Sequence, residues 1–116
     1  EIIITAGGKK IPPVNLEKPL EGGPVGQAIV VGEGRPFLVA LFAPDPEHGT
    51  EGRDAVASDR LARLYATLAP FEQVNKCAWL PRPLSVDDGT LTPTMKLKRR
   101  VIGETYRDVI EGLYAG

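Results

Sequence analysis

The sequence holds a single cysteine, a single histidine and no long apolar run, and each scarcity excludes a class of protein. Because Cys77 has no second cysteine to pair with, the chain cannot contain an internal disulfide. With His48 as the lone histidine, no Cys/His cluster has the spacing of a metal site, so we expect no metal. The longest apolar run, residues 37–43, is far too short to span a bilayer. No signal peptide is visible, and a reducing cytoplasm suits the chain.

The net charge is also close to zero. A formal charge of −1 over 116 residues gives no overall attraction to nucleic acid or to an anionic membrane. The length suits one domain, and a hydrophobic fraction of 42% can support one modest core. The chain starts with Glu1 inside a strand-like run rather than with methionine, which predicts that residues 1–116 are a single domain excised from a longer protein.

Strand signals lie in four places. Residues 2–6 are β-branched or small and end at a glycine pair, which predicts a strand followed by a turn. Residues 27–31 and 36–42 are rich in Ile, Val, Leu and Phe and flank a short glycine turn, a pattern typical of a buried hairpin. Residues 76–80 are the third main strand. The sheet is thus expected to have about three main strands plus a short N-terminal hairpin strand.

Three helices are expected to pack on this sheet, giving an α+β domain. The first spans 13–21, because proline is tolerated at a helix start and glycine can end one. A polar loop over 44–57 leads to Ser58, the expected N-cap of an amphipathic helix that Pro70 stops. The last helix spans 99–114 with an apolar stripe at helical spacing.

Several reactive or aromatic residues have ordinary structural explanations. Cys77 stands among apolar neighbours, so we expect it in the core, and Trp79 is expected to serve packing. His48 lies in an acidic, proline-rich loop and is expected to be solvated. Asp87 and Asp88 precede a glycine, which is turn chemistry rather than a catalytic carboxylate pair.

The segment 91–100 concentrates the basic residues and reads Leu-Thr-Pro-Thr-Met-Lys-Leu-Lys-Arg-Arg. It resembles the last sequence motif of the adenylate-forming superfamily, in the form typical of long-chain acyl-CoA ligases. Other branches of that superfamily place glycine immediately before the lysine, where this chain has Met95.

The segment 1–13 resembles the region that follows the hinge in the same family, where a strand leads through a glycine turn into a helix that ends in Glu, here Glu17. Long-chain ligases commonly show Thr-Ala-Gly-Gly-Lys-Asn there, and this chain has Lys10 at the last position. With residues 30–37 also similar, the resemblance covers nearly the whole chain and is weakest over 44–57. It implies the mobile C-terminal lid domain of an AMP-forming long-chain fatty acid–CoA ligase. Its partner would be the N-terminal ATP- and acyl-binding domain of the same polypeptide.

By this resemblance, Lys96 serves the first half-reaction, in which a fatty acid carboxylate attacks the α-phosphate of ATP and pyrophosphate leaves. A cation brought to that phosphate lowers the barrier electrostatically, and a loop lysine is a compact, mobile point charge. Pro93 and its threonine neighbours favour an extended loop that projects Lys96. The alternative is a solvated basic surface over 96–100, with 98–100 as surface, interdomain or phosphate-neighbouring charges. A free-standing α+β interaction module would bind a protein or nucleic acid through it, although no interleaved aromatic residues support nucleic acid.

For the second half-reaction, the resemblance assigns Gly7, Gly8 and Lys9 to the pantetheine tunnel of coenzyme A. Glycine lacks a Cβ and lets a ligand approach the backbone closely. An ordinary turn after a strand is the alternative explanation of both glycines. The resemblance implies a full-length enzyme that uses ATP, Mg²⁺ and coenzyme A and is cytoplasmic, with peripheral membrane attachment as the alternative. We expect the domain alone to bind none of these ligands and to be inactive.

Overall fold

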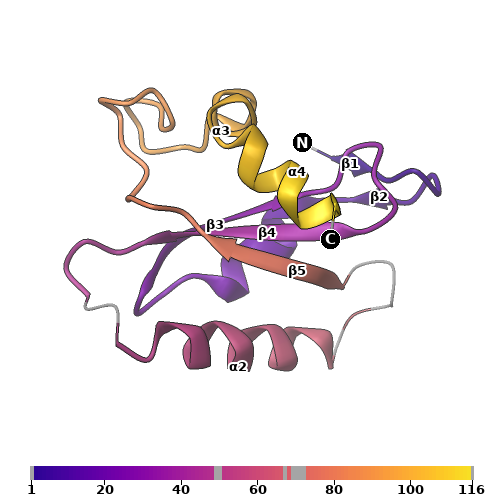
Figure 1. Cartoon of the computed structure of the whole chain (residues 1–116), viewed down its shortest axis with the longest axis horizontal. Helices are drawn as coiled ribbons and strands as arrows, with labels where there is room; N and C mark the ends of the chain where they lie inside the picture. Colours follow the sequence, from indigo (N-terminus) through magenta and orange to yellow (C-terminus); the bar gives the residue numbers. More distant parts are fainter. Residues whose placement is uncertain (1, 49–50, 67, 69–72, 116) are drawn as a thin grey trace.

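The centre of the molecule is a three-stranded sheet in the order β3-β4-β5. The computed structural model describes residues 2–48, 51–66, 68 and 73–115. Strands β3 (Val25–Val31) and β4 (Leu38–Pro44) are antiparallel, and β5 (Val74–Trp79) is parallel to β4. Helix α2 (Arg53–Tyr65) lies along one face of the sheet in the connection between β4 and β5, as a parallel pair requires (Figure 1). The three predicted strands are confirmed, and the pattern of apolar residues had not indicated their directions.

A small two-stranded hairpin precedes this sheet. Strands β1 (Ile3–Ile4) and β2 (Lys10–Ile11) pair antiparallel, so the expected N-terminal strand is confirmed in a shorter form. The predicted helix over 13–21 consists of α1 (Pro13–Glu17) followed by the 3₁₀ turn η1 (Lys18–Leu20). Pro13 takes the first helical position, where its missing N–H has no intrahelical partner.

Helix α2 begins six residues earlier than expected. Its N-cap is Gly52, with φ of 73°, and the helix starts at Arg53. Ser58 is exposed in the second turn and is not the cap, so that prediction and the C-terminal part of the predicted 44–57 loop are wrong. Ala57 is the buried residue of α2, and Leu61, Leu64 and Tyr65 pack partly buried against the same core cluster. Pro70, the predicted stop, lies outside the described residues.

The C-terminal helix is broken in two. Helices α3 (Arg99–Thr105) and α4 (Arg107–Ala115) meet at Tyr106, whose φ of −110° and ψ of 26° depart from helical values. The prediction of one helix over 99–114 is therefore wrong at this point. Ile102 and Ile110, one in each helix, lie in the same buried cluster, and a propensity argument cannot foresee the break between them.

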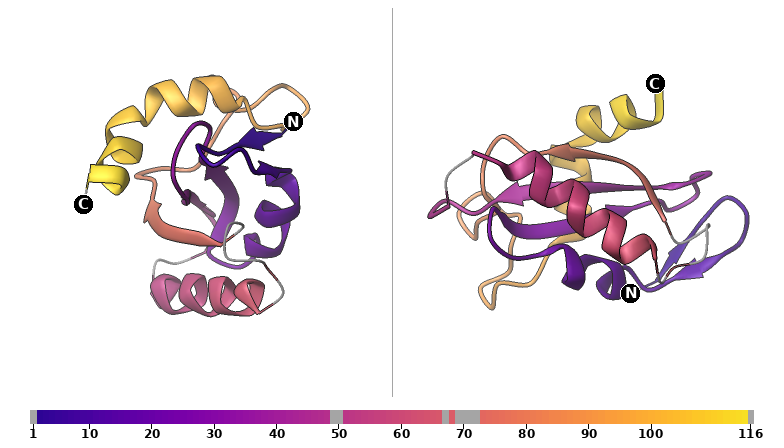
Figure 2. Two further views of the ribbon diagram at one scale, coloured as in Figure 1. Left: turned by 90° about the vertical axis from the view of Figure 1, so that its right-hand side faces the viewer. Right: turned by 90° about the horizontal axis from the view of Figure 1, so that it is seen from below.

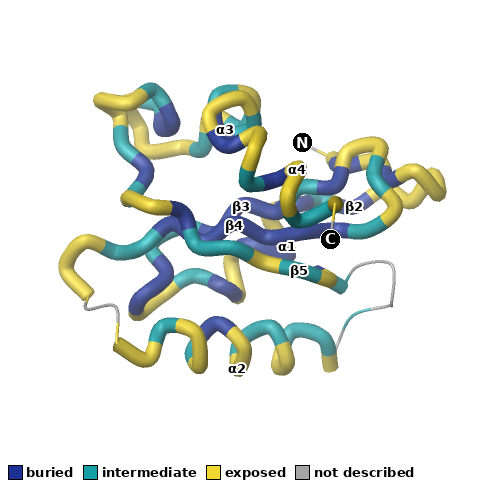
Figure 3. Tube along the Cα trace, viewed as in Figure 1, coloured by how far each residue is buried: buried dark blue, intermediate teal, exposed yellow. Residues whose placement is uncertain are grey.

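The core has two layers, one on each face of the sheet. Every residue of β4 but the last is buried, and Figure 3 shows most of β4 and part of β3 in dark blue between the outer helices. Alternate residues of a strand point to opposite faces. Residues such as Ala40 and Phe42 therefore join the cluster with α1, η1 and α2, and Leu41 joins the cluster with α3 and α4. No described helix is both long and apolar enough to cross a membrane.

Of the two β5 residues whose places were predicted, Trp79 packs as expected and Cys77 does not. Trp79 packs against Phe42 with ring centroids 5.3 Å apart, which confirms its structural role. Cys77 is exposed, so its predicted place in the core is wrong. The reason is topological, because β5 lies at the edge of the sheet rather than in the middle. His48 is exposed, as expected.

Candidate functional site

Lys96 is exposed on a tight hairpin turn that leads into α3. The Thr92 N–H donates to the Lys96 carbonyl at 2.8 Å, and the Met95 N–H donates to the Thr92 carbonyl at 2.8 Å. The expected projection of Lys96 is thus present, but the loop is a compact turn and not an extended segment. Pro93 is compatible with both, since its fixed φ also suits the second position of a β-turn.

Position 95 has a backbone conformation that favours glycine. The φ of Met95 is 66°, and Met95 is the one non-glycine residue with positive φ in the described part of the chain. This left-handed conformation costs an L-residue about 1–2 kcal/mol and costs glycine almost nothing. The Met95 side chain is 61% exposed, so packing offsets little of that cost.

The glycine turn joins β1 to β2. The Thr5 N–H donates to the Lys9 carbonyl at 3.0 Å, and the Gly8 N–H donates to the Thr5 carbonyl at 2.9 Å. Gly8 has φ of 81°, so the turn itself requires glycine there. A Cβ on Gly7 would meet only Thr5 Oγ1, at 4.0 Å, among the described atoms. Neither φ nor crowding inside this domain therefore explains the glycine at position 7.

The two turns lie far apart. In both Figure 1 and the right view of Figure 2, the indigo hairpin tip is at one end of the long axis and the orange connection from β5 to α3 is toward the other. The molecule measures 37 × 28 × 28 Å. The segments that carry the two turns thus lie toward opposite ends of the domain, and residues 7–9 are not among the residues that line the groove beside Lys96.

A groove of about 400 Å³ lies beside the Lys96 turn, between that turn and α1. Its lining residues are Val14, Glu17, Lys18, Glu21, Gln27, Met95, Lys96, Leu97 and Arg99.

Glu17 and Arg99 form an ion pair beside this groove. The Arg99 Nη1 and Nη2 atoms each donate to one Glu17 carboxylate oxygen at 2.6 Å, and the Val30 N–H donates to Oε2 at 2.8 Å. The Glu17 residue is 3% exposed and the Arg99 side chain 18% exposed. A charge buried this deeply is tolerated because it is paired and fully hydrogen-bonded.

The basic cluster 96–100 is therefore not one surface. Lys96, Lys98 and Arg100 are exposed, and Arg100 pairs with Glu104 on the outside of α3. Arg99 is largely buried and bound to Glu17, so it is not the solvated surface charge that was one expectation, and it lines the groove beside Lys96. A sequence signal for its partner existed, because Pro13, Leu16 and Glu17 share the spacing of one helical face and all three are buried.

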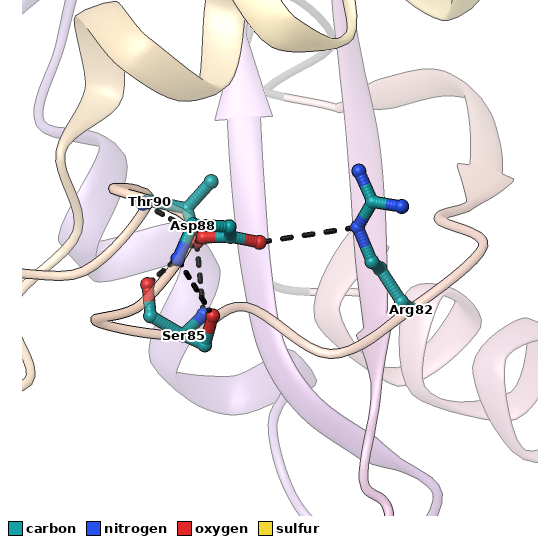
Figure 4. Close-up of polar contacts among 4 residues, drawn as sticks. All are labelled: Arg82, Ser85, Asp88 and Thr90. Atoms are coloured by element: carbon teal, nitrogen blue, oxygen red, sulfur yellow. Dashed lines mark hydrogen bonds and ion pairs between the residues drawn. The ribbon is translucent and has the colours of Figure 1, made fainter.

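The turn of residues 85–90 supports the base of the Lys96 hairpin. Asp88 accepts hydrogen bonds from the Thr90 N–H at 2.9 Å and the Thr90 hydroxyl at 2.5 Å, while its own N–H donates to Ser85 Oγ (Figure 4). Arg82 Nε lies 3.9 Å from its carboxylate. Thr90 is fully buried, and its carbonyl accepts the Lys98 N–H at 2.9 Å. The prediction of turn chemistry at Asp88 is confirmed, and this turn holds the strand that returns from Lys96.

We expect this support to weaken in acid. Hydrogen bonds from Thr90 lower the pKa of Asp88. A depressed folded-state pKa stabilises the fold fully above the usual aspartate pKa of about 4, and the contribution is lost as the pH falls through the folded-state pKa. Asp88→Asn should therefore destabilise the domain at pH 7 and make less difference below pH 4, as measured by urea unfolding at both pH values. Asp87→Asn, which removes none of these bonds, is the control. An equal effect of Asp88→Asn at both pH values would contradict the assignment.

The described residues contain no group of three His, Cys, Asp or Glu side chains that could hold a metal ion. Sequence reasoning also missed Thr5 and Thr92, whose hydroxyls take part in the two turns. The local signal was the spacing Thr-x-x-x-Lys, which occurs at both places.

Comparison with known proteins gives a consistent result. The family described as AMP-binding enzyme C-terminal domain matches residues 1–116. Long-chain-fatty-acid–CoA ligase FadD15 of Mycobacterium tuberculosis is 37% identical over 98% of this chain and 22% of its own length. Human long-chain-fatty-acid–CoA ligase 1 is 35% identical over 95% of this chain and 19% of its own length. The adenylation domain of a carboxylate reductase from Mycobacterium chelonae matches with a TM-score of 0.82 and 27% identity, over 99% of this chain and 19% of that one.

The chain thus spans about a fifth of the length of these relatives. The matched family covers every residue, and the two ligases each match at least 95% of the chain. The chain belongs to the AMP-binding enzyme C-terminal domain family and is homologous to the long-chain fatty acid–CoA ligases over nearly its whole length.

Proposed function

We propose that this chain is the mobile C-terminal lid of an AMP-forming long-chain fatty acid–CoA ligase. In this proposal Lys96 serves adenylation of the fatty acid, and the turn of Gly7, Gly8 and Lys9 serves thioester formation with coenzyme A. The observation that carries the proposal is the placement of two exposed turns at distant parts of one small domain. A domain that presents one turn and then the other to the same pocket needs this separation.

Lys96 acts through its charge. The carboxylate and the triphosphate are both anions, and negative charge gathers on the phosphoryl oxygens as the new bond forms. A preorganised ammonium in a site closed to water stabilises that charge far better than one in bulk solvent. Because Lys96 is exposed in this domain, its effect depends on a neighbouring domain covering it.

The glycine turn acts through its backbone. Gly7 has no internal requirement for glycine, and a Cβ on Gly8 would meet no described atom within 4 Å. Open space above a bare backbone suits the approach of a thin, flexible ligand arm such as pantetheine. Lys9 follows directly and adds a cation to the same exposed turn.

ATP and its Mg²⁺ are held elsewhere in this proposal, by the N-terminal domain of the same cytoplasmic polypeptide. The described residues offer no carboxylate cluster for the metal, so no step here passes through it. The alternative of an interaction module that binds a protein or nucleic acid through 96–100 is weakened, because Arg99 is committed to Glu17 inside the fold.

The test compares the full-length enzyme with the domain alone. With ATP, coenzyme A and a series of fatty acids, the full-length protein should produce AMP, pyrophosphate and acyl-CoA, and residues 1–116 should produce none. The domain carries one catalytic cation and no complete pocket, which is the physical reason. Turnover by the isolated domain would contradict the proposal, as would a gene whose start codon lies directly before Glu1. Chain-length preference should follow the N-terminal domain when domains are exchanged.

A further inference from the structure

The two turns of the candidate site are built in the same way. Each begins with a threonine, passes through a residue with positive φ three positions later, and presents a lysine at the fourth position. The first runs from Thr5 through Gly8 to Lys9, and the second from Thr92 through Met95 to Lys96.

Three hydrogen bonds recur in both turns. The threonine N–H donates to the lysine carbonyl at 3.0 Å in the first turn and 2.8 Å in the second. The N–H of the positive-φ residue donates to the threonine carbonyl at 2.9 and 2.8 Å. The lysine N–H donates to the threonine Oγ1 at 3.2 Å for Lys9 and 3.0 Å for Lys96. The third bond needs the hydroxyl, so the side chain at the start of each turn has a specific task.

The environments of the two threonines differ in one useful way. Thr5 is 8% exposed, and its turn is tied to the β3–β4 connection because the Ala6 N–H donates to the Arg35 carbonyl at 2.9 Å. Thr92 is half-buried, and its hydroxyl also lies 3.1 Å from that of Thr94. The three hydrogen bonds of the Lys96 turn join Thr92 to Met95 and Lys96 within the turn itself. We therefore expect the loss of the Thr92 hydroxyl to loosen its turn more than the loss of the Thr5 hydroxyl loosens the other.

We propose that Thr5 and Thr92 are positioning residues, each fixing the backbone of one functional turn through the amide of its lysine. The proposal rests on the function proposed above and assigns each hydroxyl to one half-reaction. A threonine side chain that accepts a backbone N–H stabilises a turn locally. Once the Lys96 amide is fixed, the direction in which its side chain leaves the turn is restricted. The ammonium then reaches a docked phosphate with less loss of conformational freedom.

The test measures the two half-reactions separately in the full-length enzyme. Thr92→Val keeps the branched shape and removes the acceptor. It should slow ATP-dependent adenylate formation about tenfold, because small misplacements of a catalytic group are costly. Thioester formation from supplied acyl-adenylate and coenzyme A should stay within about twofold of the unmodified enzyme. Thr92→Ser restores the hydroxyl and should restore adenylation. Amide hydrogen exchange at Lys96 should be faster in Thr92→Val and normal in Thr92→Ser.

The matched variant at the other turn should show the opposite bias. Thr5→Val should slow thioester formation and spare adenylation, and Thr5→Ala provides a smaller substitution at this buried position if valine prevents folding.

The Lys96→Ala variant separates the positioning role of the threonines from the proposed function. If Lys96→Ala abolishes adenylation and Thr92→Val does not affect it, the positioning role is wrong and the proposed function stands. If both variants leave adenylation unchanged, the proposed function is wrong. Equal losses in both half-reactions with Thr92→Val would mean a merely structural threonine and would also overturn the positioning role.

Discussion

Lys96→Ala in the full-length enzyme is expected to lower the rate of fatty acyl-adenylate formation by about 10²–10³-fold, the usual loss for one key electrostatic group. The variant removes a cation and little else, because the Lys96 side chain is exposed and the hydrogen bonds of its turn use backbone atoms that alanine retains. The fold of the domain should therefore be unchanged, and the loss should fall on the chemical step. ATP–pyrophosphate exchange with saturating fatty acid measures it directly.

The second half-reaction provides the internal control for Lys96. Thioester formation from supplied acyl-adenylate should be largely retained, because the proposed function assigns that step to the distant glycine turn. Lys98→Ala removes an equally exposed cation two residues further along and should leave adenylation within about twofold, since charge placement rather than total charge matters. A loss shared equally by both half-reactions would assign Lys96 a structural role instead.

Arg99→Ala is expected to lower the free energy of unfolding of residues 1–116 by about 3–5 kcal/mol, the range for removing one partner of a buried ion pair. Glu17 is 3% exposed in the unmodified fold, and the variant removes its two short bonds to Arg99 and keeps one bond from the Val30 N–H. Desolvation of an uncompensated charge is the dominant cost. Urea unfolding at pH 7, followed by circular dichroism, gives the value.

Arg100→Ala is a matched control for Arg99→Ala. It deletes the same side chain at the next position, where the guanidinium is 92% exposed and pairs with Glu104 on the surface of α3. Exposed pairs of this kind contribute about 0.2–1 kcal/mol or less, so the control should unfold close to the unmodified chain. In the double variant of Glu17→Ala and Arg99→Ala, the loss should be smaller than the sum of the single losses. Equal effects of Arg99→Ala and Arg100→Ala would show that the pair contributes no more than a surface contact.

The strands and short helices of this domain could be predicted because their signals are local. The apolar runs of β3 and β4 identify buried strands whatever packs on them, and Pro13 marks a helix start through its own covalent geometry. The errors fall where neighbours in space decide the outcome. Cys77 has apolar neighbours in sequence but lies on an edge strand. The helical pattern is interrupted at Tyr106, and Ile102 and Ile110 on either side of it lie in one buried cluster.

The candidate site also has features that are local in sequence and features that depend on long-range contacts. Residues 1–13 and 91–100 identify the family because each motif is a short contiguous run, and each turn is closed by hydrogen bonds within five residues. The sequence by itself therefore determined the family, the α+β class and the candidate lysine. Only the tertiary structure decided that Arg99 is largely buried against Glu17 while Lys96, Lys98 and Arg100 are exposed, since Glu17 lies 82 residues away in the chain. Which of several adjacent cations reaches solvent depends on such long-range pairing, because burying a charge is favourable only where the fold supplies its counter-charge.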